Sequence, residues 1–288
     1  MARTKQLKYK IIDLEQGSSE WLDYRKAQRN ASESSIVMGL SPFMKPSALA
    51  SQKWFGGEGA KDNPFMQAGH RNEPIIRENI NVALGKNFEP LVIESTQDSR
   101  FSASLDGMDG DTILEIKYSK KEFEQVAQNK KPSEYYEIQV QHQLMVSGAK
   151  KAIFAVGKGD NTCELVDITY CEVLPNKKIM SEIKTAWDNF EKDYKDLSFD
   201  EVGIKALADE LIPLMKQKEL LSQRESELKE QIKALTGGKD YKGNGISLYT
   251  SVRKGGYDYA KFVADHKIEI PSSYLKADTS IVSIKVLK

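Results

Sequence analysis

The chain has 288 residues, of which 40% are apolar and 29% are charged, a composition typical of a globular protein with a sizeable core. Its 42 Lys and Arg residues balance its 42 Asp and Glu residues, which argues against broad coating of nucleic acid but allows a local basic groove. No apolar run reaches membrane-spanning length and the N-terminus lacks a signal-peptide pattern, so we expect a cytoplasmic protein without membrane contact. Cys163 and Cys171 lack ligand spacing for zinc and are expected to be reduced thiols.

The first third of the chain is predicted to be mainly helical. A cap at Gly17-Ser18-Ser19-Glu20 precedes a helix that begins near Trp21, and polar residues 30–35 can cap a short helix over 36–40. A further helix is predicted over 47–55. A longer one lies between residues 65 and 84, where apolar residues recur at helical spacing and Gly85 can end the helix.

The middle of the chain alternates strands with helices. Strands are predicted over 91–94, 101–105, 112–118, 152–156 and 163–169. A loop rich in lysine (Lys120, Lys121, Lys130, Lys131) leads to a helix that starts at Pro132-Ser133 and runs to about residue 146, and another helix covers 175–196. This order predicts an α/β (α+β) fold with a central mixed β-sheet flanked by helices.

The chain changes character near residue 200. Leucine and isoleucine recur in steps of three and four from Leu207 to Leu235, which predicts a long, partly coiled-coil-like helix. Lys218 and Glu225 interrupt the apolar stripe and Pro213 would bend the helix, so a uniform coiled coil is not expected. The remaining tail, with segments at 246–253, 258–265 and 280–286, is predicted to be a small α+β appendage. We therefore divide the chain into domains 1–198 and 199–288, the second of unknown role.

The residues with the clearest chemical meaning surround a predicted hairpin. Asp106 ends one strand, a turn rich in Gly and Asp follows, and the next strand carries Glu115 and Lys117 on the face opposite Leu114 and Ile116. In a hairpin Asp106 would lie across from Glu115, so that two carboxylates and an ammonium group converge where a hard cation could bind. This arrangement suits metal-assisted phosphodiester hydrolysis. The alternative is an ordinary Asp-Gly turn followed by a solvated charge pair.

Five short segments resemble, in order, the motifs of the phage lambda exonuclease family, the YqaJ-type viral recombinases within the PD-(D/E)XK nuclease group. They are Trp21-x-x-x-Arg25 with Asn30-Ala31-Ser32, Gly69-x-x-x-Glu73, Ser104-Leu105-Asp106-Gly107, Glu115-Ile116-Lys117 and Tyr136-Glu137-Ile138-Gln139-Val140-Gln141. The resemblance covers roughly residues 21–156. It implies a restriction-endonuclease-like core and a nuclease domain over 1–198, and it leaves the chain after residue 200 unexplained.

The resemblance also implies a role for each matching residue. Asp106, Glu115 and the backbone carbonyl of Ile116 would hold Mg²⁺, for which Mn²⁺ can substitute, and Glu73 is a further candidate ligand. Lys117 would orient the attacking water. The catalytic set would comprise Asp106, Glu115, Lys117, Gln139 and Glu73.

Helical spacing adds one further candidate, and the resemblance implies one further group of residues. Gln143 shares the helical face of Gln139 and is a weaker candidate, whereas Gln141 points elsewhere. Arg25, Ser32 and Ser104 would form a pocket for a 5′-terminal phosphate. The alternatives without a functional role are that Arg25 is a solvated surface charge and that Glu73 is a carboxylate at the start of a helix. Pro74, directly after Glu73, would support a helix start there.

By this resemblance the chain would be a Mg²⁺-dependent 5′→3′ exonuclease that acts on double-stranded DNA ends and leaves 3′ single strands for recombination. A ring-shaped homo-oligomer, a single-strand annealing protein as partner, and a phage or prophage origin in a bacterial host cell are implied with it. Two alternatives stay open. One is a PD-(D/E)XK endonuclease or RecB-like nuclease with another DNA substrate, and the other is a catalytically idle DNA-binding assembly module.

Overall fold

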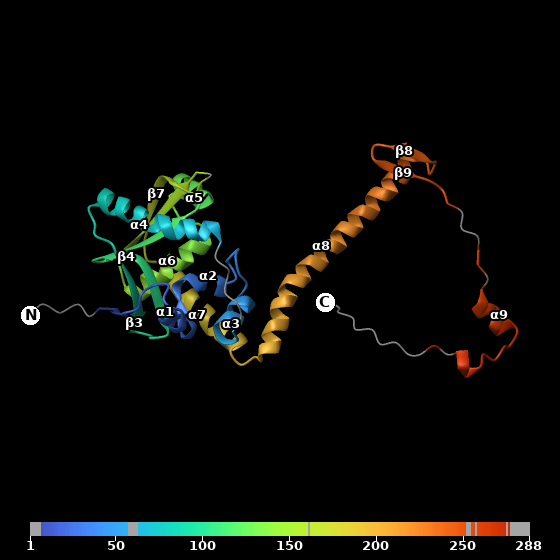
Figure 1. Cartoon of the computed structure of the whole chain (residues 1–288), viewed down its shortest axis with the longest axis horizontal. Helices are drawn as coiled ribbons and strands as arrows, with labels where there is room; N and C mark the ends of the chain where they lie inside the picture. Colours follow the sequence, from blue (N-terminus) through green and yellow to red (C-terminus); the bar gives the residue numbers. More distant parts are fainter. Residues whose placement is uncertain are drawn as a thin grey trace, which may run out of the picture. The chain divides into compact units, whose positions relative to one another are not determined.

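The computed structural model describes residues 7–56, 63–160, 162–251, 255–256, 258–274 and 276. It divides the chain into two compact units, Met1–Asp209 and Glu210–Lys288 (Figure 1). No helix in the described part of the chain combines the length and the apolarity that crossing a bilayer requires.

A seven-stranded mixed sheet forms the centre of the first unit in the described residues. The strand order is β1-β3-β4-β5-β6-β7, with the short β2 paired to β4. β4–β5 and β6–β7 are antiparallel, whereas β5–β6 and β2–β4 are parallel. The strands are β1 (Tyr9–Ile11), β2 (Arg29–Asn30), β3 (Glu89–Ser95), β4 (Phe101–Asp109), β5 (Thr112–Tyr118), β6 (Lys151–Gly159) and β7 (Leu165–Val173). The predicted mixed sheet with flanking helices is therefore confirmed.

Helices cover both faces of this sheet (Figure 1). The helical elements of the first unit are α1 (Ser19–Ala27), η1 (Ala31–Glu33), α2 (Ser34–Val37), α3 (Pro46–Trp54), α4 (Pro64–Leu84), α5 (Lys120–Asn129), α6 (Glu134–Ser147) and α7 (Lys177–Tyr194). On one face, Ile76 and Ile80 of α4 pack with Leu114 and Ile116 of β5. On the other face, α5, α6 and α7 build the larger core cluster. Burial of apolar side chains on both faces stabilises this layered arrangement.

Two expectations about helices were wrong. The lysine-rich segment after β5 is not a loop but the helix α5, which Ser119 caps by accepting a hydrogen bond from the Glu122 N–H and which buries Phe123 and Val126. Pro74 does not mark a helix start, because α4 runs through it from the Asn63 cap. Glu73 therefore lies in the middle of a helix, and the interpretation of Glu73 as a carboxylate at a helix N-terminus fails.

The second unit is built around the long helix α8 (Phe199–Thr236), which begins in the first unit. The long helix predicted from the leucine spacing is thus present, and Pro213 lies within it. A small hairpin of β8 (Tyr241–Gly243) and β9 (Ile246–Leu248) follows, then α9 (Tyr259–Asp265) and η2 (Ser272–Tyr274). The predicted segment 280–286 lies outside the described residues.

Candidate active site

The β4–β5 hairpin brings the two predicted acidic positions to neighbouring strands. Gly107 pairs with Leu114 and Met108 with Ile113, so one more step in this register places Asp106 opposite Glu115. Glycine is required at position 107 by close packing, because a Cβ there would lie 2.5 Å from the Cβ of Phe88. Gly107 of the Asp-Gly pair is therefore needed for packing of the strand as well as being typical of a turn.

A β-bulge occurs at Asp106. Glu89 of β3 pairs with Met108, but Leu91 pairs with Leu105, so β4 contains one more residue than β3 between these pairs. The carboxylate of Asp106 turns toward β5 and accepts a hydrogen bond of 2.7 Å from the backbone N–H of Ile116. Strict alternation along β4 would place Ser104 and Asp106 on one strand face, and the bulge interrupts that alternation here.

Glu115 lies at the centre of the polar cluster and is only 1% exposed. It points toward α6, while Leu114 and Ile116 join the core under α4, as the alternation of β5 predicted. Its Oε1 accepts hydrogen bonds from Lys117 Nζ and from Gln139 Nε2, the latter at 2.6 Å. The structure thus brings Glu115, Lys117 and Gln139 together.

Gln143 contributes more to this cluster than its sequence position suggested. It is fully buried, and its Nε2 donates hydrogen bonds to Glu115 Oε2 and to the carbonyl of Ser104. The available signal was its spacing of four residues from Gln139 on one helical face. Gln141 points elsewhere, as expected, and bonds to the backbone at Leu174 and Asn176.

The charges in the cluster perturb one another strongly. Burial and the neighbouring carboxylate of Glu115 raise the pKa of Asp106 well above its ordinary value, against the opposing effect of Lys117. Burial alone would lower the pKa of Lys117, but the carboxylates of Glu115 and Asp106 outweigh it and raise that pKa. Lys117 also lies 5.4 Å from the ring centre of Tyr136, a cation–π contact. Lys117 is therefore a firmly held ammonium group in these surroundings.

Glu73 approaches the cluster from α4 through an arginine that the sequence analysis missed. Arg77 forms an ion pair with Glu73 one helical turn away, and its Nε donates a hydrogen bond of 2.6 Å to the backbone carbonyl of Asp106. The only sequence signal for Arg77 was its spacing of four residues from Glu73. Glu73 thus lies near enough to Asp106 to raise the pKa of that residue further.

The donor set suits a hard cation. The carboxylates of Asp106 and Glu115 and the carbonyl of Ile116 are oxygen donors of the kind that Mg²⁺ prefers. The buried amide oxygen of Gln143, next to Glu115, has no hydrogen-bond partner in the described structure. Groups of three or more His, Cys, Asp or Glu side chains with metal-binding geometry do not occur among the described residues. The residues therefore fit an ion held by two carboxylates and backbone oxygen, rather than a cage of acidic side chains.

A second constellation surrounds Arg25. Its Nη2 donates a hydrogen bond of 2.9 Å to Ser32 Oγ, and its guanidinium lies 4.5 Å from the ring centre of Trp21. Trp21 Nε1 in turn donates a hydrogen bond of 3.0 Å to Ser104 Oγ. The structure therefore joins Arg25 directly to Ser32 and connects both through Trp21 to Ser104. Ser104 lies two residues before Asp106 in the chain.

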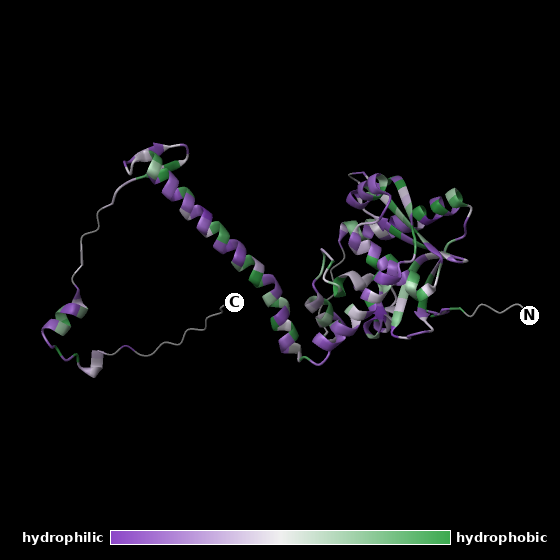
Figure 2. Ribbon diagram, turned by 180° about the vertical axis from the view of Figure 1, so that it is seen from behind, coloured by the Kyte–Doolittle hydropathy of each residue, from purple (hydrophilic) through white to green (hydrophobic). Residues whose placement is uncertain are grey.

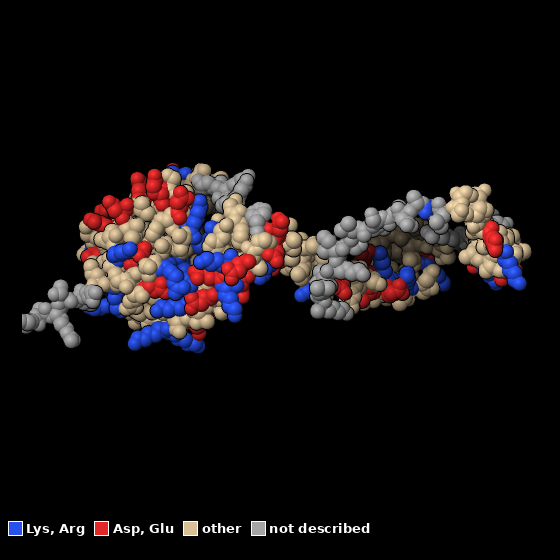
Figure 3. All heavy atoms as spheres, turned by 90° about the horizontal axis from the view of Figure 1, so that it is seen from below, with Lys and Arg blue, Asp and Glu red and all other residues tan. Residues whose placement is uncertain are grey.

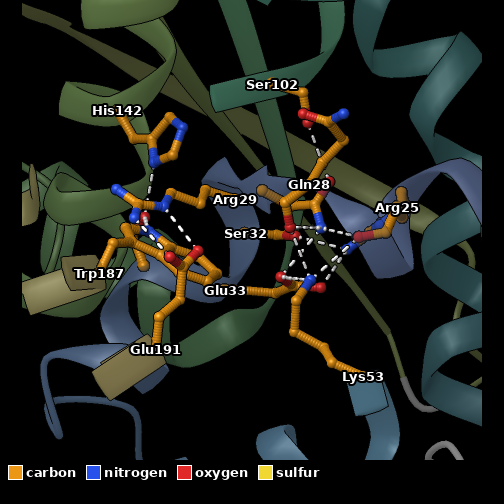
Figure 4. A network of polar contacts seen from close by, with 12 residues as sticks. Arg25, Gln28, Arg29, Ser32, Glu33, Lys53, Ser102, His142, Trp187 and Glu191 are labelled. Atoms are coloured by element: carbon orange, nitrogen blue, oxygen red, sulfur yellow. Dashed lines mark hydrogen bonds and ion pairs between the residues drawn. The ribbon is translucent and has the colours of Figure 1, made fainter. Parts of the chain in front are cut away.

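A buried lysine supports the Arg25 segment (Figure 4). Lys53 of α3 donates hydrogen bonds to the carbonyls of Arg25 (3.0 Å) and Gln28 (2.7 Å) and to Glu33 Oε2 (2.8 Å). Burial lowers the pKa of Lys53, although Glu33 opposes this effect. Arg25, Glu33 and Lys53 also line a surface pocket of about 640 Å³. Sequence reasoning missed Lys53 because its three partners lie 20 to 28 residues away in the chain.

A neighbouring network in Figure 4 is structural. His142 of α6 is fully buried, with Nδ1 2.6 Å from Ser34 Oγ, and Trp187 Nε1 donates to the same oxygen at 2.9 Å. Burial lowers the pKa of His142 to about 3. Arg29, also buried, forms a bidentate ion pair with Glu191 of α7. These contacts attach α7 to the elements that carry the Arg25 constellation.

The surface charge of the first unit is mixed. Figure 3 shows Lys and Arg side chains next to Asp and Glu side chains on the face in view, so this face is not uniformly basic. This agrees with the zero formal net charge of the chain.

Comparisons with known proteins agree with the fold. Two crystal structures of LHK-Exo, an alkaline exonuclease from Laribacter hongkongensis, have a similar fold. The complex with dAMP has a TM-score of 0.53 and 22% identity and covers 68% of this chain and 100% of its own. The other structure has a TM-score of 0.51 and 23% identity and covers 67% of this chain and 100% of its own. No curated protein matches the sequence. Residues 20–150 match the model of the YqaJ-like viral recombinase domain, so this part of the chain is similar to that family.

Proposed function

We propose that the chain is a Mg²⁺-dependent 5′→3′ exonuclease that degrades one strand from double-stranded DNA ends and leaves 3′ single strands. One observation carries the proposal: Asp106, Glu115 and Lys117 converge at the bulged β4–β5 strands of a YqaJ-like viral recombinase domain. Support for a nucleotide substrate comes from LHK-Exo, an alkaline exonuclease whose crystal structure contains dAMP.

The carboxylates of Asp106 and Glu115 and the carbonyl of Ile116 would hold the ion, with Mn²⁺ as a substitute and Glu73 as a further candidate ligand. When bound, Mg²⁺ supplies Lewis-acid polarisation of the scissile phosphate and lowers the pKa of water. Lys117 positions the attacking water by hydrogen bonding and offsets negative charge that develops on the phosphate. Gln139 holds Glu115 in place by donating to Oε1, and Gln143 does the same at Oε2.

The Arg25 constellation provides the preference for an end. The guanidinium of Arg25 can donate two parallel hydrogen bonds to a terminal 5′-phosphate, and the hydroxyls of Ser32 and Ser104 add further donors. Because Trp21 links Ser104 to the Arg25 helix, the anchor lies beside the strand that carries Asp106. A phosphate held there would fix the newly formed end for the next cleavage. The ring-shaped homo-oligomer and the annealing partner stay predictions from the resemblance.

The test compares three DNA substrates at equal concentration: linear duplex with 5′-phosphate, linear duplex with 5′-hydroxyl, and covalently closed circles. We expect fast Mg²⁺-dependent digestion of the first, slower digestion of the second and none of the third. Label at the 5′ end should be released first, as mononucleotide. Rapid cutting of closed circles would show an endonuclease instead. DNA binding without cleavage in either Mg²⁺ or Mn²⁺ would show an idle binding module.

A further inference from the structure

The second unit exposes an apolar stripe along α8. Seven-residue spacing relates Leu214, Leu221, Leu228 and Leu235, and Leu211 and Ile232, each three residues before one of them, lie on the same face. Leu214 and Leu221 are each 62% exposed and Leu235 is 88% exposed. Figure 2 shows hydrophobic positions recurring between hydrophilic ones along this long helix. Leucine exposed this regularly on one helix face indicates an interaction surface.

The helix needs such an interaction for its stability. None of the described residues between Glu210 and residue 276 is buried, so the second unit has no core of its own in the described structure. Ion pairs within the helix join Arg224 to Glu227, Lys229 to Glu225 and Lys233 to Glu230. Such pairs stabilise a helix by only about 0.2–0.5 kcal/mol each. Most helical stability in proteins comes from packing an apolar face, so a partner for this face is expected.

The charges within the stripe decide which partner fits. In heptad terms the four leucines occupy position d, and Leu211, Lys218, Glu225 and Ile232 occupy position a. In a parallel pair of α8 helices, each Lys218 would face Lys218 and each Glu225 would face Glu225. Arg224 would also lie beside Lys229 across the pair. Three like-charge contacts in one short interface disfavour this arrangement.

An antiparallel pair has the opposite charge pattern. Aligning Leu211 with Leu235 of a second copy places Lys218 opposite Leu228 and Glu225 opposite Leu221. Lys218 and Glu225 of the two copies then occupy adjacent layers, and the two-fold axis repeats this contact. At positions a and d the stripe is therefore complementary to itself in this direction, and the like-charge contact at its edge is Arg224 with Arg224 of the second copy. We propose that residues 211–235 of α8 form an antiparallel coiled coil with a second copy of this chain.

Sedimentation velocity of the full-length protein over a range of concentrations tests the proposal. We expect a mass equal to an even number of copies, whatever assembly the nuclease unit makes. Lys218→Glu or Glu225→Lys alone should weaken the doubling step by about tenfold, because attraction becomes repulsion at both symmetric contacts. The double variant Lys218→Glu/Glu225→Lys should restore the wild-type dissociation constant. In a parallel pair all four proteins would associate equally well, since the like-charge contacts persist.

Two controls make the result decisive. Lys216→Glu makes the same charge change on the outward face of α8 and should leave the dissociation constant unchanged. Glu225→Lys also removes the helical ion pair with Lys229, but the double variant removes it equally, so restoration cannot come from that pair. Leu221→Asp should abolish the doubling step. An odd number of copies, persistence of the step in Leu221→Asp, or equal behaviour of the single and double variants would overturn the proposal.

Discussion

Replacement of Lys53 by methionine tests how the Arg25 constellation is held. The side chain of Lys53 is 5% exposed and that of Glu33 is 12% exposed, and the Lys53 ammonium group donates to the carbonyls of Arg25 and Gln28 and to the carboxylate of Glu33. Breaking a buried ion pair by removing one partner costs about 3–5 kcal/mol. Asn30 still donates to Glu33 at 2.9 Å and to both carbonyls, and Arg25 lies 3.5 Å from Glu33. We therefore expect a loss near the lower limit, about 3 kcal/mol.

For a unit of this size the loss corresponds to a melting temperature lower by about 6–12 °C. The functional consequence is more specific. Without Lys53 the carboxylate of Glu33 attracts Arg25 away from Ser32, so the rate advantage of 5′-phosphorylated over 5′-hydroxyl duplex should fall. Initial rates on both substrates below the melting temperature measure this ratio, with Lys45→Met as a matched control at an exposed lysine. A melting temperature close to the wild type, or an unchanged ratio, would refute the reasoning. A wild-type ratio near one would instead refute the phosphate pocket.

Three further outcomes are expected. Lys117→Ala should reduce cleavage about 10²–10³-fold. Its dissociation constant for duplex, measured by fluorescence anisotropy, should stay within twofold of that of the control variant Lys120→Ala. A parallel loss of binding would contradict the role of Lys117. Asp106→Asn should abolish cleavage yet stabilise the fold in urea titrations at neutral pH. The folded pKa of Asp106 is raised, so the wild type loses stability as pH rises above the ordinary value of 3.8, and the advantage of the variant should vanish at lower pH. As pH falls from 6.5 toward 3, the wild type should lose up to about 1.4 kcal/mol of stability per pH unit, because the unfolded state binds the His142 proton more tightly. His142→Leu should remove this loss. Identical slopes of unfolding free energy against pH in the two proteins would show that His142 does not titrate this way.

The strand chemistry was predictable because it depends on neighbours in the sequence. Alternation along β5 separated Leu114 and Ile116 from Glu115 and Lys117, and the structure buries them on opposite faces accordingly. The Asp-Gly-rich turn predicted the hairpin that pairs β4 with β5. Family motifs then added Gln139 as a candidate site residue, and in the structure it donates a hydrogen bond to Glu115.

Local signals were also overlooked. The segment after β5 contains a cap at Ser119 and apolar residues Phe123 and Val126 at helical spacing, all of which indicate α5. The lysines at its two ends favour a loop instead, so charge and apolar spacing indicate different structures for this segment. Pro74 does not interrupt α4, because the helix buries Ala68 and Asn72 before it and Ile76 and Ile80 after it.

Other features depend on contacts that no local pattern contains. The bulge at Asp106 arises from the pairing of β4 with β3, which fixes Leu105 and Met108 against residues far back in the chain. Lys53 meets the backbone of Arg25 across 28 residues. Arg77 reaches the carbonyl of Asp106 across 29 residues. Each of these contacts needs the fold to exist before it can be recognised.

The features that resist local prediction are concentrated at one place in the sheet. A bulge, a carboxylate with a raised pKa beside a second buried carboxylate, and an amide oxygen without a partner all occur around Asp106, Glu115 and Gln143. Each one lowers the stability of the folded state, because buried charge and unsatisfied polar groups cost free energy. The apolar packing of β5 and β6 under α4 offsets that cost and keeps the strands in register. Natural proteins keep such locally unfavourable groups mainly where function requires them. The β4–β5 cluster is therefore a better candidate for the active site than the groove between α4 and β7.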